Sequence, residues 1–573
     1  MPPAAAASAP GAGSEHRGDD QMSAVLTTVP ELLIGPVLRY VSETEATIWV
    51  EVSEQCEVEI LGSSEPTFRV ENHHYALVRL EDLDPDTSYE YEVALDGERV
   101  WPSLEGMPAS RVKTLGGDGP LEIAFGSCRV AVPHEPPFTD SADQENGFEP
   151  DALWVTAEQM IEDERFRWPD QLFLLGDQVY VDEGSPRTRA KIRARRGTDT
   201  PPGDEILDFE EYTWLYHESW REPLVRWLFS TVSVSMLWDD HDMSDDWNIS
   251  RSWLEEMRRR SWWHRRAVDC IVSYWIYQHL GNLSPAELDA SEVYRRVRGN
   301  QHATEVIREW ADEIDADASG TRWSFYRDFG RTRALFIDSR AGRVLESDRR
   351  EIVDGEEWDW IVEHCSGDFD HLLLATTVPF LLSPGFDRLE AWNERLCEGA
   401  WGSAIARASE RLRRTVDFDH WAAFQSSFAK MRDLLAEVAS GQRGKQPDSI
   451  VVLSGDVHHA YLCELGLRGD ASDRSPIYQA VCSPYRNPLE EKERRVVRAA
   501  FRRPLRSICA GLARLAGAPD PGCRWRLLEG PCFDNQVSTL TLDGTRSTIR
   551  LERTVPGESD GKGLVSSFTY RLS

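Results

Sequence analysis

Residues 237–248, LWDDHDMSDDWN, contain five aspartates and one histidine, and they follow an alternating apolar segment at 231–238, TVSVSMLW. The alternation predicts a β-strand. A strand that ends in so many carboxylates is costly, because like charges repel and a buried, unpaired carboxylate is strongly unfavourable. A bound cation would compensate. The alternative is an acidic surface turn, common in a chain of formal net charge −34, and this stretch alone does not decide between the two.

The same arrangement recurs along the chain, where short apolar segments end in polar residues and helical stretches separate them. Further strands are predicted at 121–125, 171–175, 332–337, 371–376 and 449–453, running into GSC (126–128), GDQVY (176–180), DSR (338–340), TVP (377–379) and SGDVHH (454–459). Strands that alternate with helices predict an α/β sheet, and ligands of such sheets bind at the carboxyl ends of the strands. We therefore expect the six strand ends to converge on one site.

Three of these strand ends carry residues suited to metal binding. Asp177 ends one strand and Tyr180 follows it after a short turn, where a phenolate would be a hard oxygen ligand for a trivalent cation. An N-capping Asp and a packed Tyr are the alternative. Asp456 and His458 alternate and so point to one side of an extended segment, and together they form an oxygen–imidazole pair. Cys128, taken alone, is more typical of a small buried apolar residue.

In this order, GSC, GDxxY, WDDHD, DxR and SGDVHH resemble the alkaline phosphatase D (PhoD-like) branch of the calcineurin-like metallophosphatases, over roughly residues 120–550. The resemblance implies a four-layer α/β/β/α sandwich and a metal-dependent phosphoric ester hydrolase, acting on phosphomonoesters or phosphodiesters. A dinuclear metal site would activate water. Fe(III) would be held by Cys128, Asp177, Tyr180 and Asp456, and Asp177 would bridge to a divalent ion, often calcium in this branch.

The resemblance assigns the remaining positions as well. His458 matches the metal ligand in the last motif of the superfamily. The second ion would be held by Asp240 or Asp245, and the motif match does not distinguish between them. We predict that His241 donates a proton to, or hydrogen-bonds, the leaving oxygen, oriented by Asp240 or Asp242. Arg340 would contact the phosphoryl group. Cys128 and Tyr180 depart from the wider superfamily, which has Asp-x-His and a second Asp at these points, and both departures agree with the PhoD-like branch.

The chain divides by composition into three parts. Residues 1–27 are rich in Ala, Pro, Gly and Ser and are predicted to be disordered. Residues 28–115 contain alternating strands and a Leu–Tyr corner at 83–93 that resembles fibronectin type III domains, so we expect a small β-sandwich with Trp49 and Tyr91 in its core. Residues 120–573 would form the metallophosphatase domain, with helical insertions at 251–282, 386–440 and 489–517. Residues 536–553 predict two strands joined by an Asp-Gly turn.

Charge and composition restrict the partners. A net charge of −34 disfavours non-specific binding to nucleic acid and to anionic membranes. The family resemblance implies a phosphate ester as the partner. Ten cysteines without metal-like spacing indicate reduced thiols. We expect a cytoplasmic protein, because neither a signal peptide nor an apolar run long enough to span a membrane is found.

Two alternatives to the main prediction stay open. The basic, amphipathic segment 489–517 predicts a helix that covers the domain or guards the site, but it could also lie on a membrane surface, as a phospholipase D-like hydrolase of lipid diesters would require. A catalytically silent metal-binding scaffold is the other, although His241 and Arg340 would not be needed for it. The sequence leaves the physiological substrate and the oligomeric state open.

Overall fold

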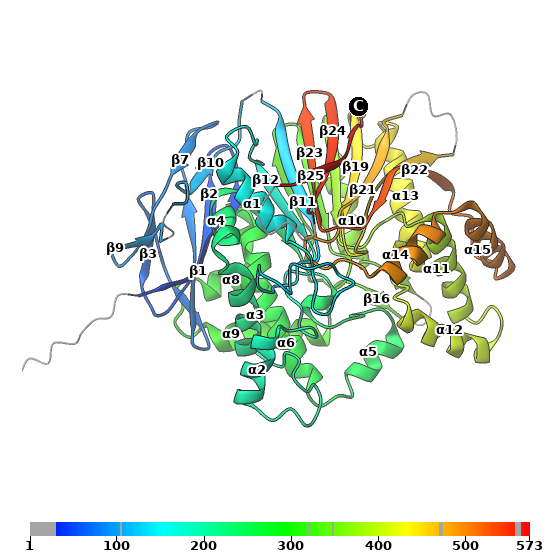
Figure 1. The fold of residues 1–573 in the computed structure, drawn as a ribbon, viewed down its shortest axis with the longest axis horizontal. Coiled ribbons are helices and arrows are strands. Elements are labelled where there is room, and N and C mark those ends of the chain that lie inside the picture. Colours follow the sequence, from blue (N-terminus) through cyan, green and yellow to red (C-terminus); the bar gives the residue numbers. More distant parts are fainter. Residues whose placement is uncertain are drawn as a thin grey trace, which may run out of the picture.

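The structure, a computed structural model, describes residues 30–103, 106–117, 119–318, 320–346, 349–468, 474–555 and 563–573. The predicted tail at 1–27 lies outside these residues. Several sheets and many helices make up the fold, which confirms the mixed α/β class (Figure 1). Within the described residues, the helices are all too short or too polar to cross a membrane.

The N-terminal region contains two four-stranded sheets, drawn in blue in Figure 1. Their strand orders are β1 (Leu32–Val41), β2 (Ala46–Val52), β6 (His73–Leu80), β5 (Phe68–Val70), and β4 (Ser63–Pro66), β3 (Glu57–Ile60), β8 (Val93–Leu95), β9 (Glu98–Trp101). Strands β7 (Ser88–Glu90) and β10 (Arg111–Lys113) form a short ribbon. Ile48 and Val78 of one sheet share a buried cluster with Val58 and Leu95 of the other. The likeness to fibronectin type III stays a prediction.

Two larger sheets form the centre of the molecule. The six-stranded sheet has the order β13 (Ser233–Leu237), β12 (Gln171–Leu175), β11 (Leu121–Gly126), β23 (Gln536–Asp543), β24 (Arg546–Arg553), β25 (Val565–Arg571). The seven-stranded sheet has the order β14 (Phe325–Phe329), β15 (Thr332–Ile337), β18 (His371–Thr376), β19 (Ser449–Ser454), β21 (Ile477–Val481), β20 (Ala460–Leu467), β22 (Cys523–Cys532). All six strands predicted to end in polar motifs are present, as is the predicted hairpin of β23 and β24.

The facing sides of the two large sheets share one core, and helices pack on the other sides. Phe125 and Phe173 lie in one cluster with Phe336 and Leu373 of the seven-stranded sheet. The opposite face of the six-stranded sheet shares a cluster with α1 (Ala152–Glu162), α4 (Pro223–Thr231) and α6 (Trp263–Tyr274). The opposite face of the seven-stranded sheet shares another buried cluster with α10 (Gly355–His364) and α13 (Gln425–Ala439).

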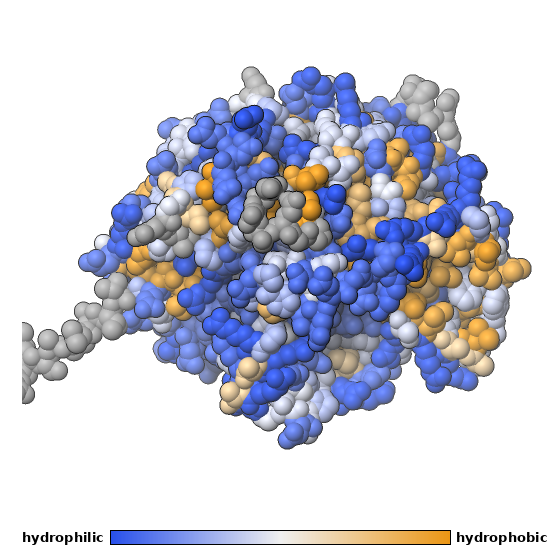
Figure 2. Space-filling model, viewed as in Figure 1, coloured by the Kyte–Doolittle hydropathy of each residue, from blue (hydrophilic) through white to orange (hydrophobic). Residues whose placement is uncertain are grey.

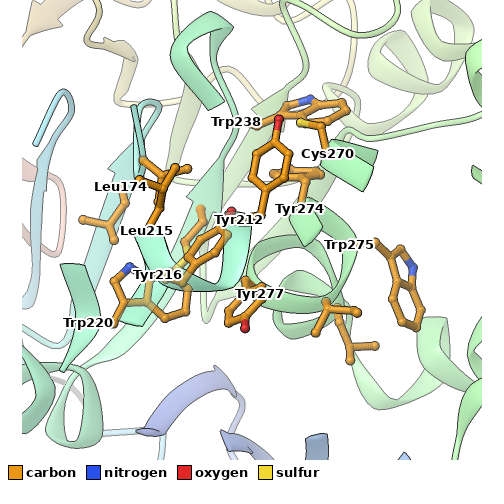
Figure 3. Close-up of a cluster of buried hydrophobic side chains, with 14 of the residues drawn as sticks. Leu174, Tyr212, Leu215, Tyr216, Trp220, Trp238, Cys270, Tyr274, Trp275 and Tyr277 are labelled. Atoms are coloured by element: carbon orange, nitrogen blue, oxygen red, sulfur yellow. The ribbon is translucent and has the colours of Figure 1, made fainter. Parts of the chain in front are cut away.

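Aromatic rings join the N-terminal sheets to the helices beside them. Tyr216 of α3 (Phe209–Trp220) stacks on Tyr277 with ring centroids 4.0 Å apart (Figure 3). Trp49 of β2 adds to this group, 5.2 Å from Tyr277 and 6.0 Å from Trp220. The prediction that Trp49 belongs to the sandwich core was therefore wrong, because its side chain leaves β2 on the face opposite Ile48.

The predicted helical insertions are subdivided. Residues 251–282 form α5 (Arg251–Met257), α6, the π-helix η2 (Trp275–His279) and the 3-10 helix η3 (Leu280–Asn282) rather than one α-helix. The insertion at 386–440 contains three helices, α11 (Pro384–Cys397), α12 (Ser403–Thr415) and α13. Other elements are α2 (Pro186–Arg195), η1 (Asp240–Asp242), α7 (Pro285–Ala290), α8 (Glu292–Val297), α9 (Ala303–Ala316), β16 (Val344–Leu345), β17 (Arg350–Glu351) and η4 (Trp421–Ala423).

The basic segment 489–517 forms two helices, α14 (Glu491–Ala500) and α15 (Arg503–Leu515), with Pro504 in the first turn of α15. This segment covers α11 closely, since a Cβ on Gly385 would lie 2.7 Å from the Ala500 carbonyl oxygen. Ile508 is 60% exposed and Leu515 is 74% exposed. Figure 2 shows hydrophobic residues at the right edge of the molecule, where Figure 1 places α15.

Candidate metal centre

The strand ends that carry the predicted ligands turn sharply. Cys128, Asp177, Asp456 and His458 all have positive φ, between 50° and 65°, which is unfavourable for residues with a side chain. Gly176, just before Asp177, also has a positive φ, and a Cβ there would lie 2.8 Å from the Asp239 carboxylate. Such strained residues at neighbouring strand ends are typical of functional sites.

Four predicted ligands gather around one carboxylate. Oδ2 of Asp177 lies 3.3 Å from the Cys128 sulfur and 3.4 Å from the Tyr180 hydroxyl. A His458 ring nitrogen lies within 4.8 Å of the Cys128 sulfur and of an Asp177 oxygen. The structure thus brings together sulfur, carboxylate, phenol and imidazole, a donor set suited to a transition-metal ion. Asn487 donates a hydrogen bond of 3.3 Å to the Tyr180 hydroxyl.

A second group of donors shares Asp177 with the first. Asp177, Asp240 and His241 offer ligand atoms within 4.8 Å of one another. Asp245 lies elsewhere, with Asp182 and His241, and its side chain is 66% exposed. The structure therefore places Asp240, and not Asp245, next to Asp177, and Asp177 is common to the two groups of donors. We call these two groups together, with Asp456, the strand-end site.

The electrostatics of Asp177 test whether a metal would fit. Burial raises the pKa of Asp177 well above its usual value, and the neighbouring Asp240 and Asp242 raise it further, while His241 opposes them. Its Oδ1 atom is buried and accepts no hydrogen bond. An unpartnered carboxylate oxygen among like charges is compensated by a cation, so the residues present fit a metal ion here.

Arg340 has a different environment from the one expected of a phosphate ligand. It is 1% exposed, and its guanidinium contacts Asp239 and Asp419 in addition to Asp456, at 3.0 Å, and Asp240, at 3.3 Å. These four carboxylates surround the cation, so a bidentate contact with phosphate would require some of the ion pairs to open. The arrangement instead neutralises part of the charge that collects at the strand ends.

His241 lies at the edge of the site with its ring against Tyr180, the centroids being 4.5 Å apart. Its Nδ1 is 3.0 Å from Oδ1 of Asp182. Although burial lowers the pKa of His241, the charge and hydrogen bond of Asp182 raise it well above its usual value. Asp182, rather than the predicted Asp240 or Asp242, forms the hydrogen bond with Nδ1 of His241. The carboxylate of Asp242 accepts hydrogen bonds from Val179 and Gln278 instead.

Other residues of the site had no clear signal in the sequence. His420 bridges Asp456 and Glu390, with its Nε2 3.2 Å from the first and its Nδ1 2.7 Å from the second. Asp419 beside it contacts Arg340. Both belong to the stretch DFDH at 417–420, within a helical insertion. Its acidic composition resembles that of residues 237–248, but no predicted strand precedes it.

A cavity of about 590 Å³ lies beside the site, between the chain segments that follow β11 and β12. A smaller hollow, lined by Tyr180, shares Arg129 and Ser185 with it. Arg187, Lys191 and Arg221 also line the larger cavity, which gives it basic side chains in a strongly acidic protein.

Comparisons with known proteins give two family matches. Residues 148–501 match the model of a PhoD-like phosphatase family, and residues 29–112 match a domain of unknown function (DUF7800). No curated protein matches the chain. A solved structure described as "Structure of PhoD" is similar, with 12% identity, 95% coverage of this chain, 91% coverage of that chain and a TM-score of 0.57. A maltogenic amylase from S. marinus, at 11% identity over 91% of this chain and 76% of that one, has a TM-score of 0.16, which is too low to bear on the fold.

Proposed function

The chain belongs to the PhoD-like phosphatase family, whose members are metal-dependent, and from this we propose that it hydrolyses phosphate esters at a dinuclear metal centre built around Asp177. One observation carries the proposal. Asp177 is shared by two groups of ligand atoms, and one of its oxygens is buried without a hydrogen-bond partner. A carboxylate that bridges two cations accounts for both facts.

We assign one ion to each side of Asp177. Cys128, Tyr180 and His458 supply sulfur, phenol and imidazole on one side, with Asp456 beside them, and this set suits Fe(III). On the other side the only well-placed predicted carboxylate is Asp240, and oxygen donors suit a divalent ion such as calcium. When bound, two such cations clamp phosphate oxygens and lower the pKa of water.

The surrounding side chains have supporting roles. His241, held by Asp182 at 3.0 Å, donates a proton to the leaving oxygen. Arg340 is a positioning residue, because its ion pairs hold Asp239, Asp240 and Asp456 together and it has little exposed surface. The leaving group occupies the neighbouring cavity, where the smaller hollow at Tyr180 joins it to the strand-end site.

We also propose the predicted domain and layer order. Two sheets face each other across a core shared by Phe125 and Phe336, and helices cover their outer faces, which supports an α/β/β/α sandwich over 120–573. The separate cluster of Ile48 and Val58 supports a β-sandwich over 28–115.

The experiment compares Asp177→Ala with Asp199→Ala, an exposed control. Metal content is measured after purification without chelator, and turnover is measured with p-nitrophenyl phosphate and its bis-ester. Asp177→Ala should lose both ions and lower kcat by more than about 100-fold, since it removes a ligand and not merely an outer contact. His241→Ala should keep the metal and lose about 100-fold or more in kcat. A fully active Asp177→Ala protein would contradict the dinuclear site, and a metal-loaded protein inactive on both esters would favour the silent scaffold.

A second candidate function, hydrolysis of lipid diesters, is favoured by one observation. Ile508 and Leu515 are exposed on α15, a helix that also carries Arg503, Arg506 and Arg514. Apolar and basic side chains on one helix are typical of segments that lie on a lipid surface.

A further inference from the structure

A second group of metal-binding side chains lies away from the strand-end site, between the N-terminal sheet and α3. Glu51 of β2 is fully buried, and its Oε1 atom lies 2.9 Å from Nδ1 of His73 and 3.0 Å from Nε2 of His217. The three donor atoms all lie within 4.8 Å of one another. Two imidazole nitrogens and a carboxylate oxygen thus point at one small volume.

The positions of these residues follow from their elements. Glu51 lies two residues after Trp49 on β2, so both side chains are on the face of the strand opposite the sandwich core. His73 begins β6, the next strand of the same sheet. On α3, Glu210 and His217 are seven residues apart, which is close to two helical turns, so they share one face of the helix. The cluster therefore joins two strands of one domain to a helix of the other.

The outer contacts resemble those of a metal-bound histidine. Nε2 of His73, the nitrogen turned away from Glu51, lies 3.0 Å from a carboxylate oxygen of Glu210. Glu210 is itself held by the indole of Trp214, at 3.0 Å. The Tyr277 hydroxyl donates to the second oxygen of Glu51 at 2.9 Å. A carboxylate behind a ligating histidine fixes its tautomer and orientation, and metal sites in proteins commonly have this contact.

The donor set and its spacing select the kind of ion. Two histidines and one glutamate bind zinc in sites where a water molecule completes the tetrahedral coordination, with bonds of about 2.0–2.2 Å. Such bonds place neighbouring donors about 3.3–3.6 Å apart in tetrahedral geometry, so the contacts of 2.9 and 3.0 Å observed here would lengthen slightly when the ion binds. A divalent cation would also balance the negative charges of Glu51 and Glu210.

We propose that Glu51, His73 and His217 bind a zinc ion that fastens the N-terminal domain to α3. The site is structural and takes no part in hydrolysis. It is independent of the dinuclear centre, because none of its ligands touches Asp177 or the other residues of the strand-end site. Protonated histidines could satisfy the same glutamates without metal, so the test has to separate zinc from protons.

The experiment measures zinc in a background where the strand-end site is disabled. Asp177→Ala and Asp177→Ala/His217→Ala proteins are equilibrated with Zn²⁺, freed of excess ion, and analysed by mass spectrometry for metal. We expect the single variant to hold about one zinc ion per chain more than the double variant. Its thermal midpoint should rise on adding Zn²⁺, and that of the double variant should not.

Two milder variants keep the test decisive if His217→Ala fails to fold. Glu210→Gln should retain the site but weaken zinc affinity by about 10–100-fold, as loss of an outer contact does. Tyr277→Phe, the matched control, removes a hydrogen bond to Glu51 without removing a ligand and should keep its zinc. Equal zinc in all variants, or a thermal midpoint that responds to pH but not to Zn²⁺, would overturn the proposal and leave a proton-held cluster.

Discussion

Asp240 and Asp245 both come from the acidic stretch at 237–248, yet the structure gives them different tasks. Asp240 lies on the 3-10 turn η1, with one oxygen accepting from the Asp246 amide at 3.1 Å and its carboxylate near Asp177. The Asp245 side chain is largely exposed and faces Asp182 and His241. Backbone geometry after β13 therefore puts Asp240, and not Asp245, next to Asp177.

Substituting the two aspartates tests this difference. Asp240→Asn, which keeps the side-chain size, should lose the divalent ion and lower kcat by about 10–100-fold or more, because a ligand charge is removed. Asp245→Asn should keep both ions and stay within about threefold of the original kcat, as a surface change does. Metal analysis and turnover of p-nitrophenyl phosphate measure both. The assignment is wrong if the Asp245 variant, and not the Asp240 variant, loses metal.

At the scale of single residues, the motifs predicted many of the candidate ligands but not the residues that hold them in place. Cys128, Asp177 and Tyr180 were predicted to lie together, and the structure places the Cys128 sulfur 3.3 Å and the Tyr180 hydroxyl 3.4 Å from the Asp177 carboxylate. Asp182 and His420 were not foreseen. Asp182 lies in a loop whose path decides its partner, and His420 comes from an insertion 36 residues before Asp456. Contacts of this kind depend on tertiary packing, which local patterns do not encode.

At the scale of elements, periodicity located the strands but not always their faces. All seven residues of β2 are buried, so alternation alone did not show which side met the sandwich core. Trp49 was assigned to the wrong side for this reason. The segment 251–282 has helical spacing throughout, but the chain turns between α5 and α6 at 258–262. Where both faces of an element are buried, pattern gives the type of structure and packing gives its orientation.

Helix α11 carries a buried acid that makes a pH-dependent prediction. Burial raises the pKa of Asp387 from 3.8 to about 7, Glu390 adds to this, and Arg388 opposes it. One of its oxygens has no hydrogen-bond partner. Because the folded-state pKa lies above the unfolded value, the folded state favours the protonated form. The contribution of Asp387 to stability is therefore greatest below pH 3.8, falls as pH rises from there to about 7, and is lost above it.

Asp387→Asn removes the buried charge while keeping the shape. The free energy of unfolding at pH 8 should rise by about 1–3 kcal/mol, less than the full linkage because packing relaxes, and it should change little at pH 4. Urea titrations at the two pH values measure the effect. Asp359→Asn, at an exposed helical position, is the control and should be neutral. A loss of stability at pH 8 would mean that the Asp387 charge makes a favourable contact.

The whole molecule assembles the site from distant parts of the chain. The first three strands of the six-stranded sheet come from residues 121–237, but β23 from the C-terminal region pairs with β11 and completes it. The hairpin of β23 and β24 was predicted from its Asp-Gly turn, whereas the pairing of β23 with β11 was not predicted. Sheet partners far apart in sequence are chosen by the packing of both faces, so strand order was beyond what local patterns could predict.

Net charge decides between α15 as a cover for α11 and α15 as a lipid-binding helix. Ile508 and Leu515, seven residues apart, share one exposed face, and this apolar surface favours lipid. The chain as a whole carries −34, however, and its field repels anionic membranes. At physiological salt the Debye length is about 8 Å, so the few arginines of α15 and the acidic groups of the rest of the surface both act only at short range.

We therefore expect the protein to stay in the supernatant when it is sedimented with vesicles of anionic phospholipid at physiological salt. Ile508→Glu and Ser507→Glu add the same charge at neighbouring exposed positions, but only the first reduces the apolar face. Both should leave turnover of p-nitrophenyl phosphate unchanged, because α15 contributes no residue to the strand-end site. Vesicle binding by the original protein that is lost in Ile508→Glu and kept in Ser507→Glu would reverse the argument. It would show that the local apolar face outweighs the field of the whole molecule, and lipid diesters would then become the favoured substrates.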